Sequence, residues 1–155
     1  MRLKMKIMFI CTGNICRSAM AHRMLEKRLK DINNNDIEVY SCGIYAENGD
    51  GSTYNAINVM KDYNVDLSTH RATNISNSNI KEMDLILCAT NAHKQEVIYM
   101  YPELKDKVFT MKEYVNKDTK DLDIKDPWGY DSYVYTRCAE EINEVIDVII
   151  DRLAK

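Results

Sequence analysis

The chain has 155 residues, 45% of them hydrophobic and 29% charged, and its net charge at pH 7 is −3. This length and composition predict one globular domain over residues 1–155 and exclude a disordered or fibrous class. The acidic balance disfavours an extended nucleic-acid surface, which needs a basic face. No run approaches the ~20 apolar residues of a membrane span, and the first residues lack the apolar core of a signal peptide. We therefore expect a cytoplasmic monomer that binds neither membrane nor nucleic acid.

Apolar runs bounded by polar or turn residues predict four strands. These cover residues 6–11, 37–43, 84–89 and 107–111. Apolar residues at helical spacing follow the first three strands and fill the end of the chain. The predicted helices cover residues 21–32, 56–60, 91–101 and 131–153. Strand and helix in alternation predict an α/β fold, a four-stranded parallel sheet with helices on both faces. In such sheets ligands bind beyond the carboxyl ends of the strands.

The cysteines are odd in number and spread along the chain, which argues against a disulfide framework. They are Cys11, Cys16, Cys42, Cys88 and Cys138. They do not form the close pairs with histidine partners that a zinc site shows, so we expect no metal and no other cofactor. Most of these thiols are interpreted as core residues.

The stretch CTGNICRS, residues 11–18, joins the first predicted strand to the first helix and is interpreted as a phosphate loop. Its backbone N–H groups can turn toward one point at a helix N-terminus, which binds a phosphate dianion. Gly13 permits a φ value that other residues resist, and Asn14 tolerates the left-handed region. Arg17 offers a planar fork to two phosphate oxygens and to the charge of a transition state.

The same positive field favours the thiolate form of Cys11, which would make it a nucleophile. Ser18 can donate a hydrogen bond to that thiolate. The structural alternative is a small buried cysteine and a solvated arginine, both of which are common. The position of the C-x5-R-S pattern between a strand and a helix favours the catalytic interpretation.

A phosphocysteine route needs a proton donor for the leaving group and afterwards a base for the attacking water, and one carboxyl group can do both. Asp126 in DPWG is the candidate, with Pro127 fixing the backbone and Trp128 as an aromatic wall. The alternative is an ordinary turn, because Asp-Pro often opens one.

FICTGNICRSAMA followed by DPWG resembles the low-molecular-weight protein tyrosine phosphatase family over essentially the whole chain. The resemblance implies that Cys11 is the nucleophile, Arg17 the phosphate clamp and Asp126 the general acid, acting on phosphorylated proteins or peptides. It also implies that phosphate and substrate are bound by Thr12, Gly13, Asn14, Ile15, Cys16, Ser18 and Trp128.

Two supporting roles follow from the same resemblance. Asn14 is expected to be held by Ser18, Ser41 and His70, which would stabilise the loop. Cys16 is similar to the second loop cysteine of the family, which captures an oxidised nucleophile as a reversible disulfide.

Two substrates stay open. The form DPWG and the segments CGIYAENGDGSTYNA and KVFTMKEYV resemble the protein-arginine phosphatase branch of the family. That branch usually has threonine where this chain has Ile15, and an apolar side chain suits an aromatic ester better than a guanidinium. We therefore predict phosphotyrosine, with phosphoarginine as the alternative.

Two other classes of function are weaker. Thioredoxin-coupled arsenate reduction needs a relay of further cysteines, and none lies between Cys88 and Cys138. A phosphate-binding or redox-sensing module would need Cys11 and Cys16 without turnover, and Asp126 beside a complete loop argues against it.

Overall fold

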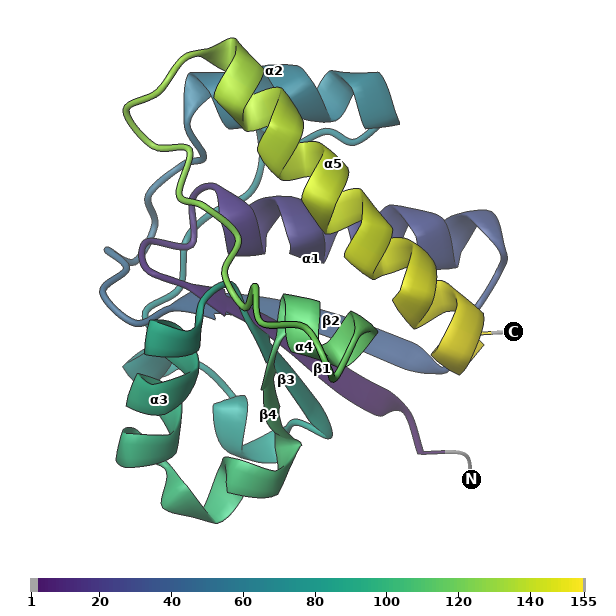
Figure 1. Cartoon of the computed structure of the whole chain (residues 1–155). Helices are drawn as coiled ribbons and strands as arrows, with labels where there is room; N and C mark the ends of the chain where they lie inside the picture. Colours follow the sequence, from purple (N-terminus) through teal and green to yellow (C-terminus); the bar gives the residue numbers. More distant parts are fainter. Residues whose placement is uncertain (1–2, 155) are drawn as a thin grey trace.

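The computed structural model describes residues 3–154 and has a four-stranded, all-parallel sheet. The strands are β1 (Met5–Cys11), β2 (Ile37–Gly43), β3 (Leu85–Cys88) and β4 (Val108–Thr110), in the order β2-β1-β3-β4. Figure 1 shows this sheet with helices on either side. The predicted fold class is thus confirmed, and β1 is a central strand.

The helices alternate with the strands in chain order. They are α1 (Arg17–Asp31), α2 (Tyr54–Met60), α3 (Asn91–Met100), α4 (Met111–Val115) and α5 (Ser132–Ile149). Helix α1 begins earlier than its apolar pattern predicts, because its first turn carries Arg17 and Ser18 at the site. Helix α4 was not predicted. Thr110 ends β4 and caps α4 by accepting a hydrogen bond from the Glu113 N–H at 3.0 Å, in a helix too short to show periodicity.

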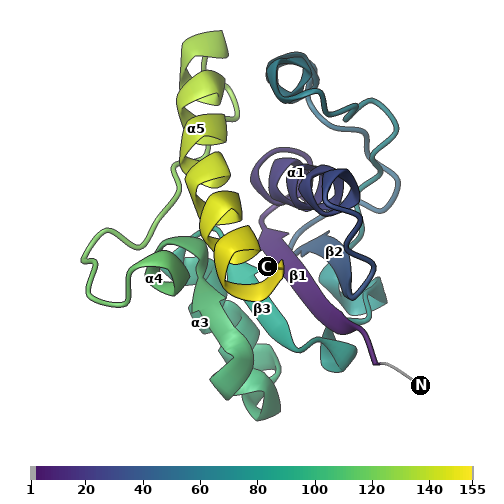
Figure 2. The same cartoon turned by 90° about the vertical axis from the view of Figure 1, so that its right-hand side faces the viewer.

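Both faces of the sheet are buried, which explains why the strands read as continuous apolar runs. Ile7 and Phe9 of β1 face a core formed with α1, α2, α4 and α5, whereas Met8 and Ile10 face a second core formed with α3. All four side chains are fully buried. Figure 2 shows α1 and α5 together on one side of the sheet.

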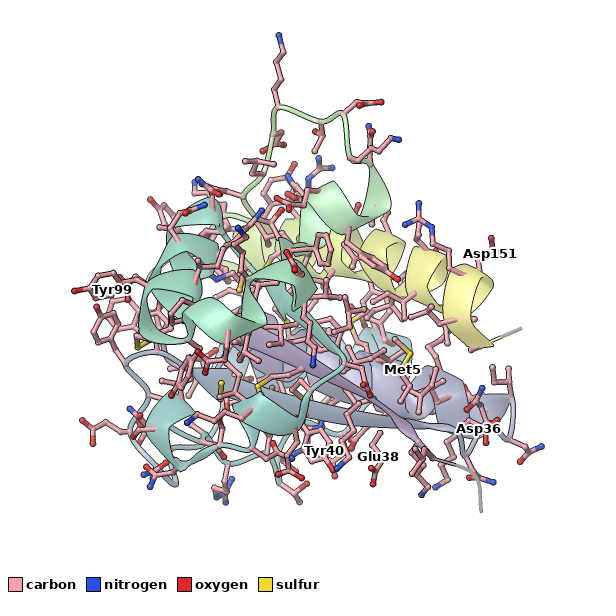
Figure 3. The ribbon with its side chains drawn as sticks, turned by 90° about the horizontal axis from the view of Figure 1, so that it is seen from below. Met5, Asp36, Glu38, Tyr40, Tyr99 and Asp151 are labelled. Atoms are coloured by element: carbon pink, nitrogen blue, oxygen red, sulfur yellow. The ribbon has the colours of Figure 1, made fainter. Side chains whose placement is uncertain are left out.

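Helix α5 packs on α1 through a buried stripe, as its spacing predicts. The stripe consists of Tyr135, Cys138, Ala139, Ile142, Val145, Ile146 and Ile149. A π-helical turn (Ile150–Ala154) follows α5. Figure 3 labels Glu38 and Tyr40 on β2, which is an edge strand of the sheet, and Tyr40 packs against the second core. Within residues 3–154 no helix is both long enough and apolar enough to span a membrane.

Candidate active site

The loop between β1 and α1 holds the Cys11 thiol at the carboxyl edge of the sheet. Cys11 is buried, and its Sγ accepts a hydrogen bond from the Asn14 N–H at 3.3 Å. The Ser18 hydroxyl lies 2.9 Å from the same sulfur. Helix α1 begins at Arg17 without a side-chain cap at Cys16, so its positive end is directed at the loop. These surroundings stabilise a negative charge on the Cys11 sulfur.

Asn14 holds the loop in place through its side chain and its backbone oxygen. Its φ of 57° lies in the left-handed region, as expected for this residue type. Its side-chain amide donates to the Ser18 hydroxyl at 2.8 Å and accepts from the Thr73 N–H at 2.9 Å. Because the Ser18 oxygen already accepts this bond, the Ser18 proton is available to the Cys11 sulfur. The backbone oxygen of Asn14 lies 3.0 Å from His70 Nε2.

His70 supports the loop as the resemblance implies. Arg23 Nε donates to His70 Nδ1 at 3.1 Å, so Nδ1 is an acceptor and the Nε2 N–H donates to Asn14. Burial and, to a smaller extent, the nearby charge of Arg23 together lower the pKa of His70 to about 4. A neutral His70 can keep both bonds.

Two expectations for the loop are wrong. Gly13 does not have a positive φ, and a Cβ at this position would meet only the Ile15 side chain at ordinary distance. Ser41 does not hold Asn14: its hydroxyl lies 2.6 Å from His22 Nδ1, because the β2 side chain points toward α1. The backbone N–H of Thr73 takes the place that Ser41 was expected to fill.

Arg17 is fixed in a buried position and keeps an unused donor. It is 4% exposed, and its Nη1 donates to the backbone oxygen of Ile124 at 2.9 Å. Its Nη2 lies 3.6 Å from Asp126 Oδ2. Among the described residues, nothing accepts a hydrogen bond from the buried Arg17 Nε. A buried guanidinium with a free N–H is suited to an anion that carries several acceptor oxygens.

One cavity of about 270 Å³ brings most of the predicted site residues together. It is lined by Cys11, Thr12, Gly13, Ile15, Cys16, Arg17, Asp126 and Trp128. Asp126 Oδ1 accepts from the Trp128 N–H at 3.1 Å, which leaves Oδ2 facing Arg17. Ile15 and Trp128 supply apolar walls, and Trp128 is 63% exposed at the mouth. The cavity can therefore hold a phosphoryl group at its base and a flat apolar group above it.

Cys16 also lines the cavity. Its Sγ lies 3.5 Å from both the Thr53 hydroxyl and the Tyr135 hydroxyl. Burial raises the pKa of the Cys16 thiol, so this sulfur stays protonated near neutral pH. Thr53 and Tyr135 were not found from the sequence, because they come from two distant helical segments.

Two more residues that shape the site were missed. A Cβ on Gly43 would lie 2.5 Å from the Thr12 backbone oxygen and 2.8 Å from the Asn14 backbone nitrogen. The one sign of this close approach in the sequence is that the predicted second strand ends in a glycine. His93 lies with its Nε2 2.8 Å from the Thr12 hydroxyl, and no local pattern pointed to it.

The remaining cysteines are core residues, as expected. Cys42, Cys88 and Cys138 are buried and free. Burial raises the pKa of Cys42 and of Cys138 to about 12, and it also raises that of Cys88. Within residues 3–154, no group of three or more His, Cys, Asp or Glu side chains is arranged to hold a metal ion.

Known proteins resemble this chain over nearly its whole length. Residues 6–155 match the family described as low molecular weight phosphotyrosine protein phosphatase. A protein-arginine-phosphatase of Geobacillus stearothermophilus is 34% identical over 148 residues, 96% of this chain and 95% of that protein. A low molecular weight protein tyrosine phosphatase structure from T. tengcongensis is 37% identical, with a TM-score of 0.89, and covers 97% of this chain and 100% of that one. A structure of YwlE arginine phosphatase with a phosphorylated active-site serine is 30% identical, with a TM-score of 0.89 and 97% of each chain covered.

Proposed function

Because the chain belongs to the low molecular weight phosphotyrosine protein phosphatase family, we propose that it dephosphorylates phosphotyrosine in proteins through a phosphocysteine formed on Cys11. One observation carries the proposal: Cys11, Arg17 and Asp126 line a single cavity. A thiol nucleophile, a fixed guanidinium and a carboxyl group are what this route of phosphoester hydrolysis requires.

In the first step the Cys11 thiolate attacks phosphorus, so that a P–S bond forms as the P–O bond to the substrate breaks. The Ser18 hydroxyl at 2.9 Å stabilises the thiolate before attack. Arg17 binds phosphoryl oxygens with the donors that the protein leaves free, and its bond to Ile124 keeps the fork oriented. Asp126 gives its proton to the departing ester oxygen, which therefore leaves as a neutral phenol.

In the second step a water molecule attacks the phosphocysteine. The Asp126 carboxylate takes the proton of that water, the P–S bond breaks and inorganic phosphate forms. The Cys11 sulfur leaves as a thiolate, and Ser18 again stabilises its charge. Asp126 is 52% exposed at its side chain, which lets water reach it.

The walls of the cavity support an aromatic ester. Ile15 and Trp128 are apolar and line the space above the loop. A guanidinium in that position would lose water without gaining a hydrogen bond from Ile15. Phosphoarginine is the second candidate, because the Geobacillus stearothermophilus relative is a protein-arginine-phosphatase.

Matched phosphotyrosine and phosphoarginine peptides separate the two candidates. We expect higher kcat/KM on phosphotyrosine, and we expect Ile15→Thr to shift the ratio toward phosphoarginine. Ile32→Thr serves as the control, because Ile32 lies at the exposed C-terminal end of α1. A preference of the unmodified protein for phosphoarginine by about tenfold, ~1.4 kcal/mol in the transition state, would replace phosphotyrosine with phosphoarginine.

A further inference from the structure

His93 links the first turn of α3 to the phosphate loop. Its Nε2 lies 2.8 Å from the Thr12 hydroxyl, and its Nδ1 lies 2.9 Å from the Thr90 hydroxyl. Thr90 is the N-cap of α3 and accepts a hydrogen bond from the His93 backbone N–H at 3.1 Å. Figure 1 shows that α3 starts close to the end of β1, where the loop begins. Since Thr12 lines the cavity, these side chains connect a helix end to the phosphate site.

The donors and acceptors of Thr90, His93 and Thr12 decide where the proton of each side chain can lie. The Thr90 oxygen accepts the backbone N–H of His93, and its single proton can be donated to His93 Nδ1. A neutral imidazole then carries its proton on Nε2 and donates it to the Thr12 oxygen. Thr12 keeps its own proton, which has no acceptor among the described residues, and the residue borders the cavity.

Without a ligand the other tautomer satisfies the same number of groups, but it leaves a different hydroxyl proton unpaired. If Nδ1 carried the proton, it would donate to Thr90, and Nε2 would accept the proton of Thr12. The Thr90 proton would then have no acceptor among residues 3–154, and Thr12 would offer only lone pairs to the cavity. An oxyanion there would face an acceptor rather than a donor, which is unfavourable.

Once a phosphoryl group is bound, only the first tautomer gives every one of these protons an acceptor. We therefore infer that His93 is a positioning residue: it holds the Thr12 hydroxyl as a hydrogen-bond donor to the bound phosphoryl group, and the Thr90 proton on Nδ1 completes the tautomer that makes this possible. The inference rests on the proposed function, since it requires a phosphoryl group in the cavity. His93 would thus support the loop at Thr12, in addition to the support that His70 gives at Asn14.

The charge state of His93 agrees with this arrangement. Burial lowers its pKa to about 4, and the nearby Arg17 charge acts in the same direction. Asp126 and Asp123 oppose the shift more weakly. At neutral pH the ring is therefore neutral and has one N–H to place.

A double-mutant cycle tests the inference with inorganic phosphate as the ligand and an aryl phosphate as the substrate. Thr12→Val removes the hydroxyl at nearly constant shape, and we expect phosphate affinity and kcat/KM each to fall by about tenfold. His93→Asn should lower both quantities by a similar factor, because its shorter side chain no longer reaches Thr12. If His93 acts through Thr12, the double variant resembles either single variant rather than their product. Equal and independent losses would overturn the inference.

Conservative variants and NMR keep the test decisive if a buried substitution harms folding. Thr12→Ser retains the donor, and His93→Gln retains an N–H near the position of Nε2, so both should recover most of the phosphate affinity. Heteronuclear NMR of the unmodified protein saturated with inorganic phosphate reads the tautomer directly, with the His93 signals assigned by their loss in His93→Gln. A protonated Nε2 supports the inference, and a protonated Nδ1 overturns it. Phosphate affinity needs no turnover, so an unmodified protein that binds phosphate but hydrolyses no aryl phosphate would contradict the proposed function alone.

Discussion

Replacing Gly43 with alanine tests whether the end of β2 sets the shape of the phosphate loop. The added Cβ would lie 2.5 Å from the Thr12 backbone oxygen and 2.8 Å from the Asn14 backbone nitrogen. Ordinary contacts between such atoms begin near ~3.5 Å, so the loop would have to move by roughly 1 Å. Neither obstacle is a flexible side chain. A displacement of that size at catalytic groups costs about 10²-fold in rate.

We therefore expect Gly43→Ala to lower kcat/KM on an aryl phosphate by about 10²-fold. Overpacking should also destabilise the fold by roughly 1–3 kcal/mol, measured by chemical denaturation. Gly51→Ala is the matched control, because its Cβ would meet only the end of the Arg71 side chain at 3.5 Å. Activity of Gly43→Ala within about twofold of the control would refute the reasoning that Gly43 fixes the loop.

Three further outcomes follow from the site. Asp126→Asn should lower kcat/KM, which reports the first step, by about 10²–10⁴ on esters with poor leaving groups and by less on activated aryl esters, and an equal small loss on both would exclude Asp126 as the acid. Peroxide should inactivate the enzyme reversibly, with activity recovered by a thiol reductant; in Cys16→Ser recovery should largely fail, and unchanged recovery would remove Cys16 from that role. His70 and His93 have folded-state pKa values of about 4, below the ordinary value of 6.5. The unfolded chain therefore binds more protons between pH 6.5 and about 4, so the free energy of unfolding should fall as pH falls through that window, by roughly 3 kcal/mol for each histidine. If the denaturation midpoints of His70→Gln change with pH as much as those of the unmodified protein, His70 does not contribute to the pH dependence of stability.

The strands and the nucleophile loop were predictable because their signals are local. The central strand β1 is buried on both faces, so its sequence is a continuous apolar run. Helix α5 carries one buried stripe over 18 residues, long enough to show its period. The motif around Cys11 is contiguous, and Asp126 is marked by the proline after it.

The supporting contacts were not predictable because they join residues that are far apart in sequence. His93 and Thr12 are 81 positions apart, and nothing near either residue requires the other. Ser41 was assigned to Asn14 by resemblance, whereas the direction of its side chain in β2 brings it to His22. The structure requires a glycine at Gly43 rather than at Gly13. At Gly43 the backbone of the loop comes too close for a Cβ, while Gly13 has neither a left-handed φ nor a crowded Cβ position.

The phosphorylated intermediate is the most direct test of the proposed mechanism. Asp126→Asn is mixed with an activated aryl phosphate, so that the first step still occurs while hydrolysis of the intermediate lacks its base. The reaction is quenched in acid, digested and analysed by mass spectrometry, with Cys11→Ala and Cys16→Ser as parallel samples. We predict one phosphoryl group on the Cys11 sulfur in Asp126→Asn, the same modification when Cys16→Ser is added, and none in Cys11→Ala. A phosphoryl group on another residue, or turnover that persists in Cys11→Ala, would contradict the assignment of Cys11 as the nucleophile.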